Sequence, residues 1–536
     1  MTTNYFGEFN RLCREEGLTL TAQAVGGALC MAGDNIEVKR LVDKPQGEFW
    51  GYQTEGNYDI KDCSSAAHVY GKQIASGEAF TDITYKHSLA DIKNLADAAY
   101  AFGINEFVVC AVAYQADAAG RRLNTANGRQ YVLNRLNTLW PLSRPFWDYQ
   151  ARCSWMLRQG KPVSDFALYL GDDVPKRTLG HLLPDIPQGY DFDALTTDAL
   201  LRRVRAVDGR LVLPDGVSYA MLLLPSHEAL TPAVCQKVEA LQAAGVKVWD
   251  PHRGQPLREA LLAAGLRPDV DVPAARRLYF CHRQTDEADI YFLNNHSDET
   301  VSDRFTFRRA AASVELWNPV TGERRRLPSE SRDGLTSVRL TMAPRQSFFV
   351  VLSDAPSTLP LLQQPAESAS LLLTGPWQLQ FNPAQGGPAN PVSLDSLTDW
   401  TQNIDPRQCY YSGTAVYTTT FTLSKKDRAA AYRLAFERIG SVAQVFVNGH
   451  EAGTAWCSPW QVDITPNIRK GRNRLEVRVA NCLWNRLVGD ANRPEAERLM
   501  QQTTPLAQPS DSLLPSGLMG TVRITTQTRS PLHRRF

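Results

Sequence analysis

Residues 74–113 decide the fold of the N-terminal part of this chain. They contain the segments IASGEAFT (74–81), LADIKNLADAAYAF (89–102) and INEFVVCAVA (104–113). The first segment predicts a strand, and the second has the apolar spacing of a helix. The third is a continuous apolar run, which is typical of a strand buried on both faces of a parallel sheet. This strand–helix–strand order predicts a parallel sheet or an α/β barrel.

The pattern extends in both directions from this core. Residues 18–25 and, more weakly, 36–42 predict two further strands, and residues 59–73 and 143–159 predict helices. About four strands are found where a closed (β/α)8 barrel needs eight. We therefore expect residues 1–160 to form the second half of such a barrel, with two sheet edges to be covered.

The rest of the chain changes character twice. Alternating strands and helices continue at first, without a glycine-rich phosphate-binding loop, and short strands separated by turns then replace them. An Asn448-Gly449 pair marks a hairpin turn in the last part. The predicted domains are a flavodoxin-like α/β domain (161–272), a small β-sandwich (273–356) and a jelly roll (368–530).

Composition excludes several classes of function. The formal net charge of +2 gives no electrostatic reason to expect binding to nucleic acid or to an anionic membrane. No apolar run is long enough to span a bilayer. The first residues lack the basic start and apolar stretch of a signal peptide, and the cellular location stays open. The ten cysteines are scattered, which predicts mostly free, buried thiols.

Two glutamates stand out by their position. Glu48 follows the strand predicted at residues 36–42, and Glu78 lies late in the strand at 74–81. Because the carboxyl ends of barrel strands line the active site, both side chains are expected over one pocket. Glycoside hydrolysis uses two carboxyl groups, one as proton donor and one to activate water or attack. An ordinary salt bridge near a strand end is the alternative role for each.

Aromatic and polar residues near these glutamates are candidates for binding substrate. An aromatic face suits the apolar face of a sugar, and amide or imidazole groups can bind hydroxyls. Packing in the core or shaping a loop explains each of them equally well. The candidates are Trp50, His68, Tyr85, Asn137 and Trp140.

Ordered motifs along nearly the whole chain resemble glycoside hydrolase family 106. In the first 160 residues they are GEFW (47–50), KD (61–62), AAHVYGK (66–72), EAFT (78–81), FGIN (102–105), LNRLNTLW (133–140) and DYQARC (148–153). Further motifs are QGYDFD (188–193), YSGTAVY (411–417), VNG (447–449), VDIT (462–465) and WNRLVGD (484–490).

The resemblance implies an inverting α-L-rhamnosidase that acts on rhamnose-containing oligosaccharides or polysaccharides. It implies a galactose-binding-like jelly roll at the C-terminus, and calcium near the active site, with no ligands identified. It also implies that Glu48 and Glu78 are active-site carboxylates, with Glu78 the better candidate for the base. Glu48 is expected to orient substrate, hold calcium or assist as a second carboxylate, and the proton donor is expected in the absent half of the barrel.

Two other functions remain open at this point. The chain could be a non-catalytic glycan-binding remnant, whose half barrel is inert while its sandwiches keep their fold. It could instead be a related glycosidase of the same architecture with another sugar preference.

Overall fold

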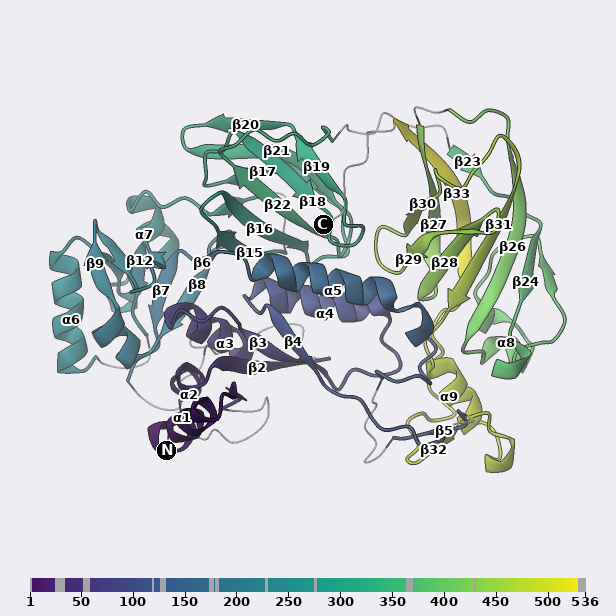
Figure 1. Cartoon of the computed structure of the whole chain (residues 1–536), viewed down its shortest axis with the longest axis horizontal. Coiled ribbons are helices and arrows are strands. Elements are labelled where there is room, and N and C mark those ends of the chain that lie inside the picture. The colour runs from purple at the N-terminus through teal and green to yellow at the C-terminus, as the bar shows by residue number, and fades with distance from the viewer. Residues whose placement is uncertain are drawn as a thin grey trace.

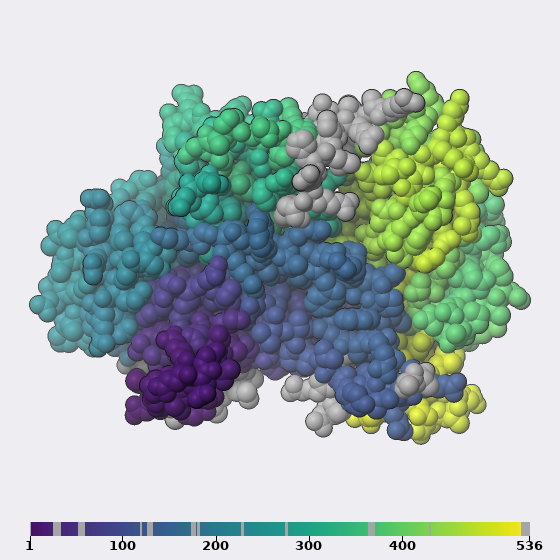
Figure 2. Space-filling view, in the orientation of Figure 1, coloured from purple at the N-terminus to yellow at the C-terminus, as the bar shows by residue number. Residues whose placement is uncertain are grey.

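A computed structural model gives the arrangement of the chain (Figure 1). It describes residues 2–24, 34–51, 58–117, 120–125, 132–172, 178, 183–226, 230–273, 277–362, 370–427 and 430–528. The space-filling view shows the N-terminal part between a teal α/β unit and a yellow C-terminal sandwich (Figure 2).

The N-terminal unit is built on a parallel sheet with the strand order β1-β2-β3-β4, which is also the chain order. The strands are β1 (Thr21–Ala22), β2 (Lys44–Trp50), β3 (Ser76–Thr81) and β4 (Glu106–Val109). Helices α3 (Tyr58–Val69) and α4 (Leu89–Ala101) connect successive strands, and α1 (Glu8–Glu15), α2 (Asn35–Leu41) and α5 (Arg144–Leu157) complete the unit. Four parallel strands were expected, and four are present in the described part of this unit.

Local signals explain most of these elements. Ser88 and Asp91 form a reciprocal capping box at the start of α4, so the backbone donors of its first turn are satisfied. Gly47 in β2 packs against the backbone of α3 so closely that a Cβ atom would lie 2.5 Å from the Asp59 carbonyl oxygen. Only glycine allows the helix and strand to approach this closely.

Two strand predictions need correction. Residues 36–42, expected as a weak strand, form α2, because the Asp34 side chain accepts a hydrogen bond from the Glu37 backbone and so caps a helix. The strand follows at Lys44. The run 104–113 gives only the short β4, where Val108 is 43% exposed. This strand is therefore not buried on both faces of the sheet.

The second unit contains the parallel sheet β13-β12-β7-β8 beside α3. Its strands are β7 (Phe166–Tyr169), β8 (Phe192–Leu195), β12 (Met221–Leu223) and β13 (Lys247–Trp249), with helices α6 (Pro232–Ala243) and α7 (Leu257–Ala263). A small antiparallel sheet adds β9 (Arg205–Val207), β10 (Arg210–Val212) and β11 (Ser218–Tyr219). The predicted alternation of strand and helix is therefore present.

Two sheets form the small sandwich, with strand orders β14-β17-β21-β20 and β19-β18-β22-β16-β15-β6. Their strands are β6 (Lys161–Val163), β14 (Val270–Asp271), β15 (Leu278–Gln284), β16 (Ala288–Asn295), β17 (Val301–Phe307), β18 (Ser313–Trp317), β19 (Arg324–Leu327), β20 (Ser329–Arg332), β21 (Leu335–Met342) and β22 (Ser347–Ser353). Strands β6 and β14 come from the segment that precedes residue 273, and both pair with sandwich strands. The sandwich is thus tied to both ends of the α/β unit.

The C-terminal unit is a second, larger sandwich of antiparallel sheets ordered β23-β33-β27-β30 and β25-β24-β26-β31-β28-β29. Its strands are β23 (Ser370–Leu372), β24 (Trp377–Gln380), β25 (Val392–Leu394), β26 (Thr414–Leu423), β27 (Ala430–Ile439), β28 (Val442–Val447), β29 (His450–Ala455), β30 (Gln461–Asp463), β31 (Gly471–Ala480) and β33 (Leu518–Thr528). The predicted hairpin turn joins β28 and β29, with positive φ at both Asn448 and Gly449.

The described cysteines agree with the prediction of mostly free, buried thiols. The nine cysteines in the described ranges are free, and five of them are buried. Among the described residues, no helix combines the length and the apolar character that crossing a bilayer requires.

Candidate functional site

Glu48 and Glu78 lie side by side on neighbouring strands. They are register partners in the parallel pair β2–β3, so their side chains leave the sheet on the same face. The adjacent Phe49 points to the other face, where its ring lies 5.5 Å from those of Phe80 and Phe107 in the core under the helices. The two carboxylates therefore share the face opposite Phe49.

Glu78 is held by two neutral donors. Its Oε1 accepts a hydrogen bond of 2.9 Å from the Thr81 hydroxyl, and its Oε2 accepts one of 3.2 Å from the Gln23 amide. The first partner ends the same strand, and the second follows β1. This partly buried carboxylate is thus oriented by both neighbouring segments without a cationic partner in these contacts.

Glu48 is more deeply buried, with 6% of its surface exposed. Burial is the largest cause of the raised pKa of its carboxyl group. The nearby carboxylates of Asp59 and Glu78 raise this pKa further, whereas the Trp50 indole and the Lys39 ammonium oppose the change. A carboxyl with a raised pKa beside a second carboxylate is the arrangement that separates acid and base roles.

Behind Glu48 lies a buried charged cluster that the sequence did not reveal. We call it the α2–α3 cluster, formed by Asn35, Lys39, Asp59 and Asp62, whose exposure does not exceed 2%. The ammonium of Lys39 lies 2.7 Å from Asp59 Oδ1, and the Asn35 amide donates to Asp59 and Asp62 at 2.8 and 2.7 Å. The other oxygen of Asp59, Oδ2, accepts a hydrogen bond of 2.9 Å from the Glu48 backbone.

This cluster fixes the strand that carries Glu48. Strand β1 pairs with β2 only at Lys44 and Pro45, so beyond that point the Asp59 side chain takes the place of a strand partner for the Glu48 N–H. Burial raises the pKa of Asp62 to about 7. The segment 36–42, which carries Lys39, was interpreted as a strand, so the sequence did not indicate the cluster.

The predicted binding residues divide into two groups. Trp50 ends β2, pairs with Thr81 and lies two positions beyond Glu48, on the same face. His68 is not brought to this face. It is buried between α3 and β8, where its Nδ1 lies 2.9 Å from Asp193. The same aspartate accepts a hydrogen bond from the Tyr219 hydroxyl. Its surroundings are those of a packing histidine.

The remaining three lie in the connections that follow β3 and β4. Tyr85 is buried, its hydroxyl accepts the Asn134 amide at 2.9 Å, and burial raises its pKa. Asn137 makes hydrogen bonds within its own loop, to the Val132 carbonyl and from the Leu139 backbone. Trp140 is 43% exposed and lies edge-on to Trp147. Of the three, only this indole offers a large open surface.

The C-terminal unit borders the same end of the sheet. The Lys86 ammonium, in the connection after β3, lies 4.0 Å from the centre of the Trp484 ring, which belongs to α9 (Trp484–Ala491). Strand β5 (Arg122–Leu123), after β4, pairs with β32 (Gln501–Gln502). Residues far apart in the chain thus form one wall at the carboxyl ends of the strands.

Calcium near the active site stays an expectation, since the described residues identify no ligands for it. Within the described ranges, no three histidine, cysteine, aspartate or glutamate side chains come together as a metal-binding group. The face of Glu48 and Glu78 offers two carboxylates and neutral groups, so we derive no step through a metal ion.

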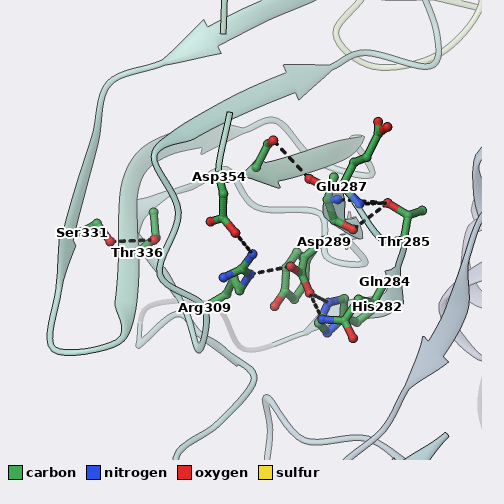
Figure 3. Close-up of polar contacts among 12 residues, drawn as sticks. His282, Gln284, Thr285, Glu287, Asp289, Arg309, Ser331, Thr336 and Asp354 are labelled. Carbon is green, nitrogen blue, oxygen red and sulfur yellow. Dashed lines mark hydrogen bonds and ion pairs between the residues drawn. The ribbon is translucent and has the colours of Figure 1, made fainter. Parts of the chain in front are cut away.

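A second charged cluster lies between the α/β unit and the small sandwich (Figure 3). His282 is held between Asp269 and Asp289, at 2.8 and 3.0 Å, and Arg309 joins the latter to Asp354. These two aspartates raise the pKa of His282 to about 9, against the effect of burial, which is the largest single influence and lowers it. The ring of Tyr291 stacks on the imidazole. Since the imidazole is 5% exposed and both nitrogens are bonded, the cluster is structural.

Comparison with known proteins identifies the family. The model of the α-L-rhamnosidase family, glycoside hydrolase family 106, matches residues 1–254 and 250–330. The chain belongs to this family of glycosidases. Residues 398–507 match the galactose-binding-like domain of glycosyl hydrolase family 2, in agreement with the expected C-terminal unit.

Two similar proteins are considerably longer than this chain. A solved rhamnosidase from Novosphingobium sp. PP1Y superposes with a TM-score of 0.89 at 27% identity, covering 98% of this chain and 55% of that one. A curated relative from Formosa agariphila, named a putative beta-glucuronidase, is 30% identical over 396 residues, which are 66% of this chain and 33% of the relative. The chain therefore spans about half and a third of the lengths of these two proteins.

Proposed function

We propose that this chain carries part of the active site of an inverting α-L-rhamnosidase, with Glu78 as general base and Glu48 as its assisting carboxylate. The observation that carries the proposal is the in-register pairing of the two glutamates, whose side chains leave the sheet on the same face. Membership of the rhamnosidase family and the superposition on a solved rhamnosidase support the choice of sugar.

In this mechanism Glu78 accepts a proton from water. The water oxygen then forms a bond to the anomeric carbon while the bond to the glycosidic oxygen breaks on the opposite face of the sugar. A protonated acid donates its proton to that leaving oxygen, so the departing group leaves as an alcohol. The Thr81 and Gln23 donors orient Glu78 for this task, and no neighbouring cation withdraws its negative charge in those contacts.

The proton donor is not Glu48 in this proposal. Strands in a sheet lie about 4.8 Å apart, whereas the acid and base of an inverting enzyme are about 6.5–9.5 Å apart. A register partner on the next strand is thus closer than the reaction requires. We place the acid across the pocket, on further βα units that close the four-stranded sheet into a barrel. Residues 1–160 alone then form an incomplete site, and the chain by itself shows little or no rhamnosidase activity.

The test is Glu78→Gln in a barrel-complete enzyme, made by supplying the missing βα units to this chain. Turnover of an aryl α-L-rhamnoside should fall by at least about 100-fold, the low end for general acid–base catalysis. Glu106→Gln is the matched control, because Glu106 lies on the same face at the other end of the strands, paired with Lys44 and Arg158. Near-normal turnover by Glu78→Gln would refute the assignment of Glu78 as general base. A barrel-complete parent enzyme without turnover would instead favour the alternative function, a non-catalytic glycan-binding remnant.

A second candidate differs only in the sugar. The curated relative carries the name of a putative beta-glucuronidase, which favours a glycosidase of the same architecture acting on a uronic acid. Parallel assays with an aryl α-L-rhamnoside and an aryl β-D-glucuronide separate the two. Proton NMR of the first-formed sugar anomer tests inversion independently.

A further inference from the structure

A cavity of about 730 Å³ lies among three parts of this chain, near the end of the strand that carries Glu48. It begins at Gly51, directly after the last residue of β2, and runs along the first turns of α4. The small sandwich supplies a second wall, and the segment 457–460 between β29 and β30 supplies a third. Its volume is within the range of small-ligand sites.

The walls of this cavity are held by specific contacts. Arg345 and Asp298 form a two-bond ion pair at 2.8 and 2.9 Å. The Lys93 ammonium, paired with Asp97, also donates to the Arg345 carbonyl oxygen at 3.0 Å, which ties the sandwich to α4. The cations Lys93 and Arg345 are thus neutralised by aspartates. The other charged lining residues, Lys86 and Asp91, have opposite signs, so a ligand would meet a polar surface rather than a cluster of one sign.

Two groups on these walls can bind a ligand. The Oδ1 atom of Asn94 is buried and has no hydrogen-bond partner among the described residues, although a buried amide oxygen normally accepts one. On the opposite wall the Trp460 indole is partly buried against the C-terminal core and borders the cavity. An aromatic face together with a neutral acceptor suits a sugar ring, which presents apolar C–H groups and hydroxyl donors.

We propose that this cavity is a subsite for a further sugar residue of an oligosaccharide, with Trp460 against the ring and Asn94 Oδ1 accepting a hydroxyl. The inference rests on the proposed glycosidase function for its choice of ligand. In this proposal the cavity takes a sugar of the same glycan as the residue over the glutamates, since Gly51 on its wall directly follows the strand that carries Glu48. The enzyme would then recognise an extended chain rather than a single terminal sugar.

The subsite is tested by binding, without any need for hydrolysis. Isothermal titration calorimetry of the 536-residue chain would use two octasaccharides, one from rhamnogalacturonan I and one from a neutral rhamnan. At least one should bind, and Trp460→Ala and Asn94→Ala should each weaken that binding by about tenfold or more, as for a central contact residue. Trp460→Phe keeps an aromatic face and should stay within about threefold of the parent.

Two controls keep the result interpretable. Trp155→Ala removes a 56% exposed indole on α5 that does not border this cavity, and it should leave binding unchanged. The assay measures binding and not hydrolysis, so a failure of the catalytic proposal does not remove this result. Unchanged binding in both Trp460→Ala and Asn94→Ala overturns the subsite, as does a parent chain that binds neither octasaccharide at about 1 mM. Thermal melting of each variant identifies any that fail to fold.

Discussion

Replacing Lys39 by methionine should destabilise the N-terminal sheet far more than the loss of one surface charge would. Its ammonium is fully buried and lies 2.7 Å from the 3% exposed side chain of Asp59, so the variant leaves a carboxylate in the interior without its cation. Removing one partner of a buried pair typically costs about 3–5 kcal/mol. A Coulomb estimate of about 4 kcal/mol, for charges about 4 Å apart at an effective dielectric constant of about 20, agrees with that range.

The neighbouring carboxyl of Asp62 limits any relief. Lys39 lowers the pKa of that group, which burial has raised to about 7, so losing the ammonium raises it further. The double variant Lys39→Met, Asp59→Asn removes both charges and should recover most of the lost free energy of unfolding. Recovery is expected to be incomplete because Asp59 also bonds the Glu48 backbone.

Hydrogen exchange measured by mass spectrometry is the suitable assay, because a chain of several units need not unfold in one step. Peptides covering β2 and α3 should lose protection in Lys39→Met and regain it in the double variant. Lys44→Met is the matched control, since the pair of Lys44 and Glu106 is partly exposed, 3.3 Å apart, and worth at most about 1 kcal/mol. A loss below about 1 kcal/mol in Lys39→Met, or no recovery in the double variant, would refute the argument.

Two further predictions concern pH and association. The folded-state pKa of His282, about 9, exceeds its unfolded value of about 6.5, so its stabilising contribution is complete below pH about 6.5 and lost as the pH rises through about 9. The unfolding midpoint measured between pH 6 and 10 should fall over that window, and His282→Gln should flatten the fall; an equal slope in both proteins contradicts the assignment. The second concerns Val112, which is 73% exposed beyond β4, beside the sheet edge. Val112→Lys should reduce concentration-dependent association in sedimentation velocity, and equal association in both proteins would show that this edge is not where copies meet.

The sequence predicted the parallel strands, most helices and the two sandwiches because their apolar spacing is local. Residues 36–42 failed for a local reason too: the β-branched and apolar residues suggested a strand, while the Asp34 cap that decides for a helix was overlooked. The exposure of Val108 could not be predicted from its apolar run, since burial depends on what lies across the sheet.

The candidate site was predicted in part. Glu78 was predicted late in its strand, whereas Glu48 was expected after a strand at 36–42 and lies instead within β2; the two are register partners on one face. His68 could not be placed in the same way, because its partner Asp193 is 125 residues away and belongs to another sheet. The α2–α3 cluster was missed because it forms only when two helices and a strand meet, and no local pattern records that meeting.

The pairing of β5 with β32 has a consequence for synthesis. The Thr125 backbone donates to the Thr503 hydroxyl across a separation of 378 residues. At about 5–20 residues per second, roughly 20–75 s pass between the emergence of these two segments from a ribosome. During that interval the connections after β4 lack the wall that later holds them. A nascent chain therefore exposes the connections after β4 to chaperones and proteases until the segment of β32 has emerged.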